Sequence, residues 1–140
     1  MGEHPERVRR RLIPDEAQVQ IILGSLLGDA RIEGADGARY MTVSHRRDRA
    51  DYVRWKYDRL GPLAAHAPIE YGERLGFRTI AHPLFDDLAP LFCVRGPGRG
   101  HIVKELLAPL GLAVWMSDVG RLELRADVFL PAQRAFALTA

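Results

Sequence analysis

Residues 21–33, IILGSLLGDARIE, join an apolar run containing small residues to a single acid, Asp29. Gly24 and Gly28 lie four residues apart, so on a helix they share one face. Each glycine costs a helix about 1 kcal/mol relative to alanine. Close packing of another helix over Gly24, Ser25 and Gly28 would offset that cost. This stretch therefore predicts a buried helix that is paired with a second helix.

Asp29 would lie at the carboxyl end of this helix, where the helix dipole disfavours an anion by about 0.3–1 kcal/mol. A bound cation would explain a carboxylate in that position. The simpler interpretation is an aspartate that ends a helix in an ordinary turn. Taken alone, these residues favour the simpler interpretation.

The composition indicates one domain in an intracellular protein. The 140 residues are 47% hydrophobic, enough to build a core, and the net charge is +2. A single cysteine, Cys93, excludes an internal disulfide and a cysteine-cluster zinc site. The start, MGEHPERVRRRL, lacks the apolar core of a signal peptide, and no run is long enough to span a bilayer. We expect a cytoplasmic or organellar protein that is neither secreted nor bound to a membrane.

Periodicity and turn residues predict helices that alternate with hairpins. Residues 1–13 form a basic arm, and Pro14 begins the first helix. The predicted elements are a helix over 14–28, a hairpin of 30–33 and 39–45, a helix over 46–60, a hairpin of 69–73 and 77–82 with its turn at 74–76, a short helix from Pro83, a mobile basic loop over 94–101, a helix over 101–110, and a helix over 111–118. Beyond these, LELRADVF suggests a strand and PAQRAFAL the start of a helix.

Two further patterns bear on function. In ARYMTVSH, alternation puts Tyr40, Thr42 and Ser44 on one face of a strand, opposite Met41, Val43 and His45. Residues 39–59 carry more Lys and Arg than Asp, which we interpret as a solvated face. Residues 110–120, LGLAVWMSDVG, repeat the opening pattern, an apolar helix with small residues that ends on one aspartate, Asp118.

The order of these elements resembles the LAGLIDADG homing endonucleases. Four stretches carry the resemblance: ILGSLLGDARI is similar to the first signature motif, RADYVRWKYDRLGPL to the middle helix, FRTIAHPLFDDLAPLF to the segment after the fourth strand, and IVKELLAPLGLAVWMSD to the approach to the second motif. The resemblance implies an α+β fold, an αββαββα unit whose antiparallel sheet forms a DNA-binding saddle. It assigns residues 14–110 to that domain, and residues 111–140 to the second motif helix and the start of an incomplete second unit.

The resemblance also implies metal-dependent hydrolysis of both strands of DNA at a long target site, with Mg²⁺ as cofactor and double-stranded DNA as partner. By motif position, Asp29 and Asp118 are the metal ligands and catalytic residues. Arg95 or Arg99 stands where the family has a basic residue, and Arg99 is the one we assign to catalysis. The candidate DNA contacts are Arg31, Arg39, Tyr40, Thr42, Ser44, Tyr71, Arg74 and Arg78.

The chain departs from the family pattern in three places. Ala30 stands where the first motif usually has glycine, and the second motif has Ser117 for an acid and Val119 for a glycine. The residues after Asp118 are also too few for a second complete unit. Three explanations are a truncated member, an excerpt of a longer chain, and a half-enzyme that forms a homodimer through its motif helices. We favour the truncated member, which would bind DNA but be impaired in cleavage. The alternatives to an endonuclease are a non-catalytic DNA-binding relic or regulator, and an RNA-binding splicing helper.

Overall fold

A computed structural model describes residues 12–92 and 98–119. The helices are α2 (Glu16–Leu27), α3 (Ala50–Leu60), α4 (Pro83–Leu88), α5 (Gly98–His101) and α6 (Pro109–Asp118). The strands are β1 (Arg31–Glu33), β2 (Tyr40–Arg46), β3 (Ile69–Tyr71) and β4 (Arg74–Arg78). The predicted α+β class is confirmed. The basic arm, except residues 12 and 13, and the elements predicted after residue 119 lie outside the described residues.

Helix α2 begins and ends at local signals in the sequence. The Asp15 side chain accepts a hydrogen bond from the Gln18 backbone N–H at 2.7 Å, and the Gln18 side chain accepts one from the Asp15 N–H at 2.9 Å. This reciprocal capping satisfies two of the free N–H groups at the helix start. Gly28 closes the other end, where its N–H bonds to the carbonyls of Gly24 and Ser25. From Gln20 onward every residue of α2 is buried, as the sequence predicts.

Four strands form one antiparallel sheet in the order β1-β2-β4-β3. Thr42 in the central strand β2 lies opposite Arg31 of β1 and Arg78 of β4. Alternation along β2 is confirmed, because Met41, Val43 and His45 are buried while the residues between them are half-exposed. The sheet thus has one face on the core and one face open.

The predicted turn of the second hairpin is wrong. Residues 74–76 belong to strand β4, and the chain turns at Gly72, whose φ of +58° is a left-handed conformation that glycine adopts without strain. The sequence offers two glycines, and the pattern of the strands favours a turn at Gly76. It instead lies in the strand opposite Ser44, where a side chain would collide with the β2 backbone.

The region before α6 also differs from the prediction. Residues 98–101 of the predicted loop form the helical turn α5, which continues as a π-helical turn over Ile102–Leu106. The helix predicted to run to residue 110 stops there, because Leu107 is extended and Pro109 starts a new helix. Proline is well suited to a first helical position and poorly suited to a helix interior.

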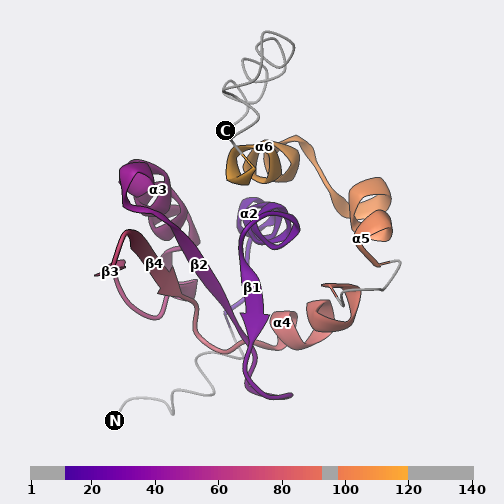
Figure 1. Cartoon of the computed structure of the whole chain (residues 1–140). Helices are drawn as coiled ribbons and strands as arrows, with labels where there is room; N and C mark the ends of the chain where they lie inside the picture. The colour runs from indigo at the N-terminus through magenta and orange to yellow at the C-terminus, as the bar shows by residue number, and fades with distance from the viewer. Residues whose placement is uncertain (1–11, 93–97, 120–140) are drawn as a thin grey trace, which may run out of the picture.

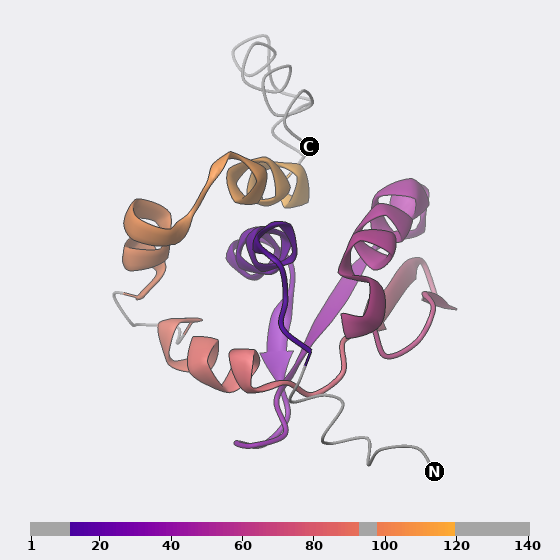
Figure 2. The same cartoon turned by 180° about the vertical axis from the view of Figure 1, so that it is seen from behind.

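Helix α2 lies at the centre of the described fold (Figures 1 and 2). The sheet and α3 cover one side of α2, α4 and α5 lie on the other, and α6 crosses the remaining face. Phe85 of α4 and Ile102 are fully buried in the same core cluster as α2. Within the described residues, no helix has the length and apolar character that crossing a membrane requires.

Candidate functional site

The small residues of α2 let α6 approach it closely. A Cβ atom on Gly24 would collide with the carbonyl oxygen of Gly111, and one on Gly28 would collide with the Asp118 side chain. The buried Gln20 side chain adds two hydrogen bonds, donating to Leu106 O at 2.9 Å and accepting from Ala108 N–H at 2.7 Å. Asp29 and Asp118, 89 residues apart, therefore meet at one end of the helix pair.

Ser25 lies between the two glycines and is completely buried. Its hydroxyl oxygen has no hydrogen-bond partner among the described residues. Gly24 and Gly28, on either side of Ser25 in the sequence, are the residues against which α6 packs.

Asp118 is fully buried and surrounded by donors. Its Oδ2 accepts a hydrogen bond from the Asp29 backbone N–H at 3.0 Å. Its Oδ1 accepts one from Lys56 Nζ at 2.7 Å and one from the Tyr52 hydroxyl at 2.6 Å. The exposed fraction of the Asp118 side chain is 0%. Both oxygens are thus occupied by groups of the protein.

Lys56 is the functional candidate that sequence reasoning missed. Its side chain is also 0% exposed, so interpreting the charges of residues 39–59 as a solvated face is wrong at this position. Burial lowers the pKa of the Lys56 ammonium, and the Asp118 carboxylate opposes that shift. A signal existed in the sequence, because Lys56 follows Val53 by three residues and precedes Leu60 by four, on the buried face of α3.

His45 connects this buried pair to Asp29. Its Nε2 lies 3.2 Å from Lys56 Nζ, and its Nδ1 lies 3.5 Å from Asp29 Oδ2. Burial, followed by the charge of Lys56, lowers the pKa of His45 to about 4, so the ring is neutral at pH 7. Alternation predicts that His45 shares a face of β2 with Met41 and Val43, but nothing local distinguishes it from an ordinary core histidine.

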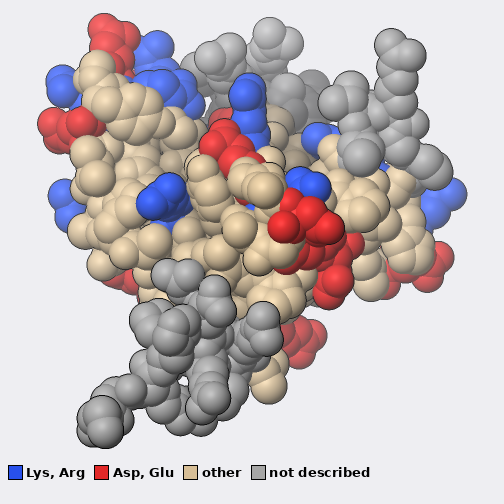
Figure 3. Space-filling view, turned by 90° about the horizontal axis from the view of Figure 1, so that it is seen from below, with Lys and Arg blue, Asp and Glu red and all other residues tan. Residues whose placement is uncertain are grey.

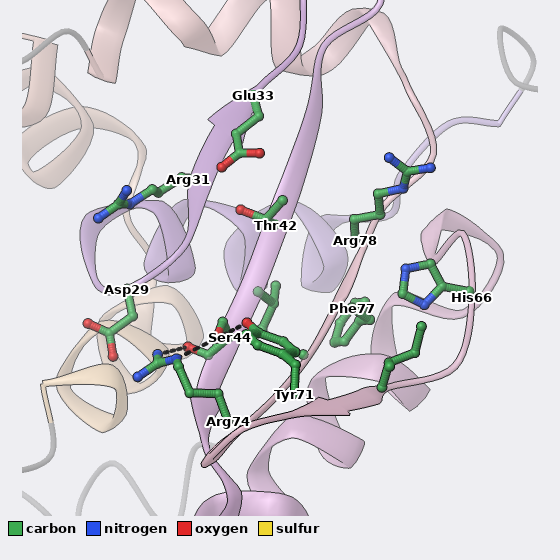
Figure 4. A pocket seen from close by; sticks show the side chains of 13 residues that line it. Asp29, Arg31, Glu33, Thr42, Ser44, His66, Tyr71, Arg74, Phe77 and Arg78 are labelled. Atoms are coloured by element: carbon green, nitrogen blue, oxygen red, sulfur yellow. Dashed lines mark hydrogen bonds between the residues drawn. The ribbon is translucent and has the colours of Figure 1, made fainter.

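Asp29 is the more accessible of the two aspartates. Its side chain is 46% exposed and lines a groove of about 640 Å³ over the open face of the sheet (Figure 4). Burial raises the pKa of Asp29, the nearby Asp118 charge adds to the rise, and Lys56, Arg49 and Arg74 oppose it. Asp29 therefore joins the buried cluster to the open groove.

Most of the predicted DNA contacts line this groove. The predicted residues in its lining are Arg31, Thr42, Ser44, Tyr71, Arg74 and Arg78. Glu33 and His66, which sequence reasoning did not select, line it as well. Tyr40 and Arg39 are not in the lining: the Arg78 guanidinium lies over the Tyr40 ring at 5.1 Å, and Arg39 Nε lies 3.6 Å from Asp86 Oδ1.

Arg74 is held in place inside the groove. Its Nε donates to Ser44 Oγ at 2.7 Å and its Nη2 donates to Ser44 O at 2.9 Å. The Tyr71 hydroxyl also donates to Ser44 Oγ, which ties β3 to β2 across the intervening strand. Figure 4 shows the Arg74 guanidinium on the same side of the groove as Asp29. A positioned cation beside a carboxylate suits an anionic ligand.

Arg99, predicted as a catalytic residue, lies at a different place. Its Nη1 donates to Leu27 O at 3.3 Å, at the last turn of α2, and its guanidinium lies 5.6 Å from the Phe92 ring centre. Arg99 does not line the groove that contains Asp29. Arg95 lies outside the described residues.

The two aspartates differ in how each could hold a divalent cation. Within residues 12–92 and 98–119, no three His, Cys, Asp or Glu side chains converge as a metal site. Both Asp118 oxygens already accept hydrogen bonds from the protein, and the side chain is 0% exposed. Asp29 alone fits the mode in which Mg²⁺ is held by one carboxylate together with phosphate oxygens and water.

Charge elsewhere is mixed. In the described part of the face shown in Figure 3, Lys and Arg side chains are interspersed with Asp and Glu. In the groove, by contrast, several arginines lie on the same surface as the half-exposed Asp29 carboxylate.

Comparison with known proteins identifies one family, relatives named RecA, and a solved structure with the same fold. The model described as the LAGLIDADG DNA endonuclease family matches residues 19–135. Proteins named RecA are similar over most of this chain: the one from Mycolicibacterium chitae is 30% identical over 135 residues, and the one from Mycobacterium shimoidei is 32% identical over 134 residues. These matches cover 90% and 89% of this chain, and the chain spans 30% of the length of each relative.

A solved structure shares the fold. It is that of the homing endonuclease I-WcaI bound to its DNA recognition sequence, with a TM-score of 0.62 and 16% sequence identity. The match covers 84% of this chain and 60% of the other.

Proposed function

The chain belongs to the LAGLIDADG DNA endonuclease family, and we propose that it binds duplex DNA across the open face of its sheet and hydrolyses phosphodiester bonds at Asp29. One observation carries the proposal: the half-exposed Asp29 carboxylate opens onto a groove lined by arginines. The fold shared with I-WcaI, solved on its DNA recognition sequence, supports DNA as the partner.

The groove is suited to binding DNA. Arg31, Thr42 and Arg78 lie opposite one another on β1, β2 and β4, so they form one row across the open face. Arginine bonds phosphate oxygens and the edge of guanine in a bidentate manner, and threonine bonds either a base or a phosphate. This row would meet the duplex, while Ser44 holds Arg74 near Asp29.

The chemistry we propose uses one carboxylate and one positioned cation of this chain. Asp29 would hold Mg²⁺ jointly with the scissile phosphate. When bound, the ion would activate water and stabilise the leaving oxygen. Arg74, fixed by its two bonds to Ser44, would face the phosphate and stabilise the negative charge that develops on it.

The relatives point to the setting of this activity. A segment of the LAGLIDADG family shared with proteins named RecA, and spanning 30% of their length, fits a mobile insert carried in frame within a host protein. We therefore favour an intein over an intron as the origin of this chain. The target would then be a host gene that lacks the insert.

The test is a cleavage assay on a plasmid that carries an uninterrupted mycobacterial recA gene. A plasmid with the insert in place is the matched control. We expect Mg²⁺-dependent nicking or linearisation of the uninterrupted gene only, and loss of that cleavage in Asp29→Asn. Because burial raises the pKa of Asp29, its ionised form is disfavoured in the fold, so the variant should melt no lower than the original.

Cleavage that persists in Asp29→Asn or in EDTA would rule out this mechanism. Salt-sensitive binding to the uninterrupted gene without cleavage would instead support the second candidate, a non-catalytic DNA-binding protein. The observation favouring that candidate is the occupied state of Asp118, which leaves a single accessible aspartate between the two motifs.

A further inference from the structure

Lys56 and Asp118 form a buried ion pair, and neither residue lines the groove. Both side chains are 0% exposed, and their atoms Nζ and Oδ1 lie 2.7 Å apart. Taking two charges out of water is unfavourable unless further polar contacts accompany the pair. Here such contacts come from α3, β2 and the end of α2, and they lead to Asp29.

The three N–H bonds of the Lys56 ammonium have three partners. One is Asp118 Oδ1, the second is His45 Nε2 at 3.2 Å, and the third is the ring of Tyr52, whose centre lies 4.8 Å from Nζ. A lysine ammonium can only donate hydrogen bonds, so His45 Nε2 must accept. A neutral imidazole that accepts at Nε2 carries its proton on Nδ1.

That proton faces the catalytic carboxylate, since His45 Nδ1 lies 3.5 Å from Asp29 Oδ2. At the same time, the Asp29 backbone N–H donates to Asp118 Oδ2 at 3.0 Å. The chain of contacts therefore closes into a ring, from the Asp29 backbone through Asp118, Lys56 and His45 to the Asp29 side chain. We call these four residues the aspartate ring.

We infer that Asp118, Lys56 and His45 act as positioning residues that fix the backbone and the side chain of Asp29, and that Asp118 has this role in place of direct metal ligation. The inference rests on the proposed function of Asp29. It changes the role assigned to the second motif, because its aspartate, Asp118, supports Asp29 from the buried side of the site.

Two charge-removing variants and their combination test this assignment. Asp118→Asn or Lys56→Met alone leaves one buried charge without its partner, so each should lower the melting temperature. The double variant Asp118→Asn/Lys56→Met leaves neither charge, and its melting temperature should recover. Exposed residues supply matched controls, Asp58→Asn on α3 and Lys104→Met near α5, and these should not alter melting or cleavage.

The single-turnover cleavage rate at saturating DNA then separates the two roles of Asp118. If Asp118 positions Asp29, the double variant should cleave about 10- to 100-fold more slowly than the original, as is usual when a supporting contact is lost. Its affinity for DNA, measured in EDTA, should not change. A well-folded double variant as inactive as Asp29→Asn would overturn the assignment.

His45 provides a second readout of the same kind. His45→Leu removes the contact to Asp29 and should slow cleavage by about 10- to 100-fold without changing DNA affinity. His45→Asn places an amide N–H near the position of Nδ1 and should recover most of the rate. Equal losses in both variants would count against a positioning role.

A measurement independent of activity keeps this inference separable from the proposed function. In long-range ¹H–¹⁵N spectra of the metal-free protein at pH 7, the signal of His45 should be that of a neutral imidazole with its proton on Nδ1. The spectrum of His45→Asn would assign that signal. A proton on Nε2 of His45 overturns the aspartate ring even if the enzyme cleaves, whereas an Nδ1 proton in a protein that cleaves no DNA would leave the ring intact and reject the proposed function.

Discussion

At the scale of single residues, the two aspartates at the ends of α2 and α6 occupy different environments. Asp29 is 46% exposed beside the groove, whereas Asp118 is fully buried against Lys56 and Tyr52. The difference follows from the partners each meets, because β2 and α3 supply a histidine and a lysine at the same end of the helix pair. Burial alone changes what a carboxylate can do, since an enclosed carboxylate is out of reach of a ligand that approaches from solvent, whereas an exposed one is accessible.

His45 gives a prediction about stability and pH. Its pKa is about 4 in the fold, below the ordinary 6.5, so the unfolded chain takes up the proton first as the pH falls. The stability contributed by neutral His45 is therefore complete above pH 6.5 and is lost by about pH 4. The loss amounts to about 3 kcal/mol at most.

Urea unfolding in EDTA at several pH values measures this slope. The groups that face His45 are Asp29, Lys56, Asp118, Arg49, Arg74 and the Tyr52 ring. Because other groups of the protein also take up protons as the pH falls, the informative quantity is the difference between the original and His45→Asn, which should have a flatter slope from pH 6.5 to 4. The exposed His101→Asn should keep the original slope; an equal slope in His45→Asn would contradict the prediction.

At the scale of elements, the pairing of α2 with α6 depends on the absence of side chains. Gly24 faces the Gly111 backbone, and Gly111 in turn faces the Gln20 side chain, so neither helix can carry a methyl group at the crossing without moving. Backbone atoms cannot rotate away as a flexible side chain can. The contact is therefore sensitive to a single added carbon.

Gly24→Ala should destabilise the protein by about 1–3 kcal/mol through overpacking, although alanine is the better helix former. The midpoint of urea unfolding measures the loss. Gly100→Ala is the matched control, because it is also helical, has no neighbour within 4 Å of an added Cβ, and lacks a positive φ. Equal midpoints for the two variants would mean that the helices do not approach as closely as described.

At the scale of the whole molecule, α2 is the element on which the others depend. It contacts α6 and α3, and its apolar residues belong to the core cluster that also contains residues of the sheet and of α4. Its Gly24–Gly28 face is covered by α6 of the same chain. The predicted homodimer through the motif helices stays a prediction, and forming it through this face would require α6 to be displaced.

One central helix predicts one cooperative unfolding transition for the described fold. The two tryptophans report from different places, Trp55 from α3 and Trp115 from α6. Trp55→Phe leaves the reporter on α6 and Trp115→Phe leaves the one on α3. Within each variant, the fluorescence midpoint in urea should coincide with the midpoint from far-UV circular dichroism.

A fluorescence midpoint for Trp115 clearly below the circular-dichroism midpoint would contradict this expectation. It would show that α6 leaves α2 before the rest of the fold opens. That result would also weaken the aspartate ring, because Asp118 belongs to α6.

The sequence by itself determined most of the elements, the faces of β2 and the two aspartates at helix ends. These features depend on neighbours within a few positions: helical and strand periodicity, capping residues, and glycines spaced by one turn. The second hairpin shows the limit of such reasoning, because choosing between Gly72 and Gly76 for the turn required knowing which glycine had β2 against its backbone.

Only the tertiary structure decided which aspartate faces the groove and which is enclosed. Lys56 and Asp118 are 62 residues apart, and no local pattern specifies that they pair. A lysine on an amphipathic helix is ordinarily solvated, and it is buried here because α6 brings a carboxylate to it. Whether charged residues on distant elements form an ion pair depends on how those elements pack, and the packing is set by all the elements together.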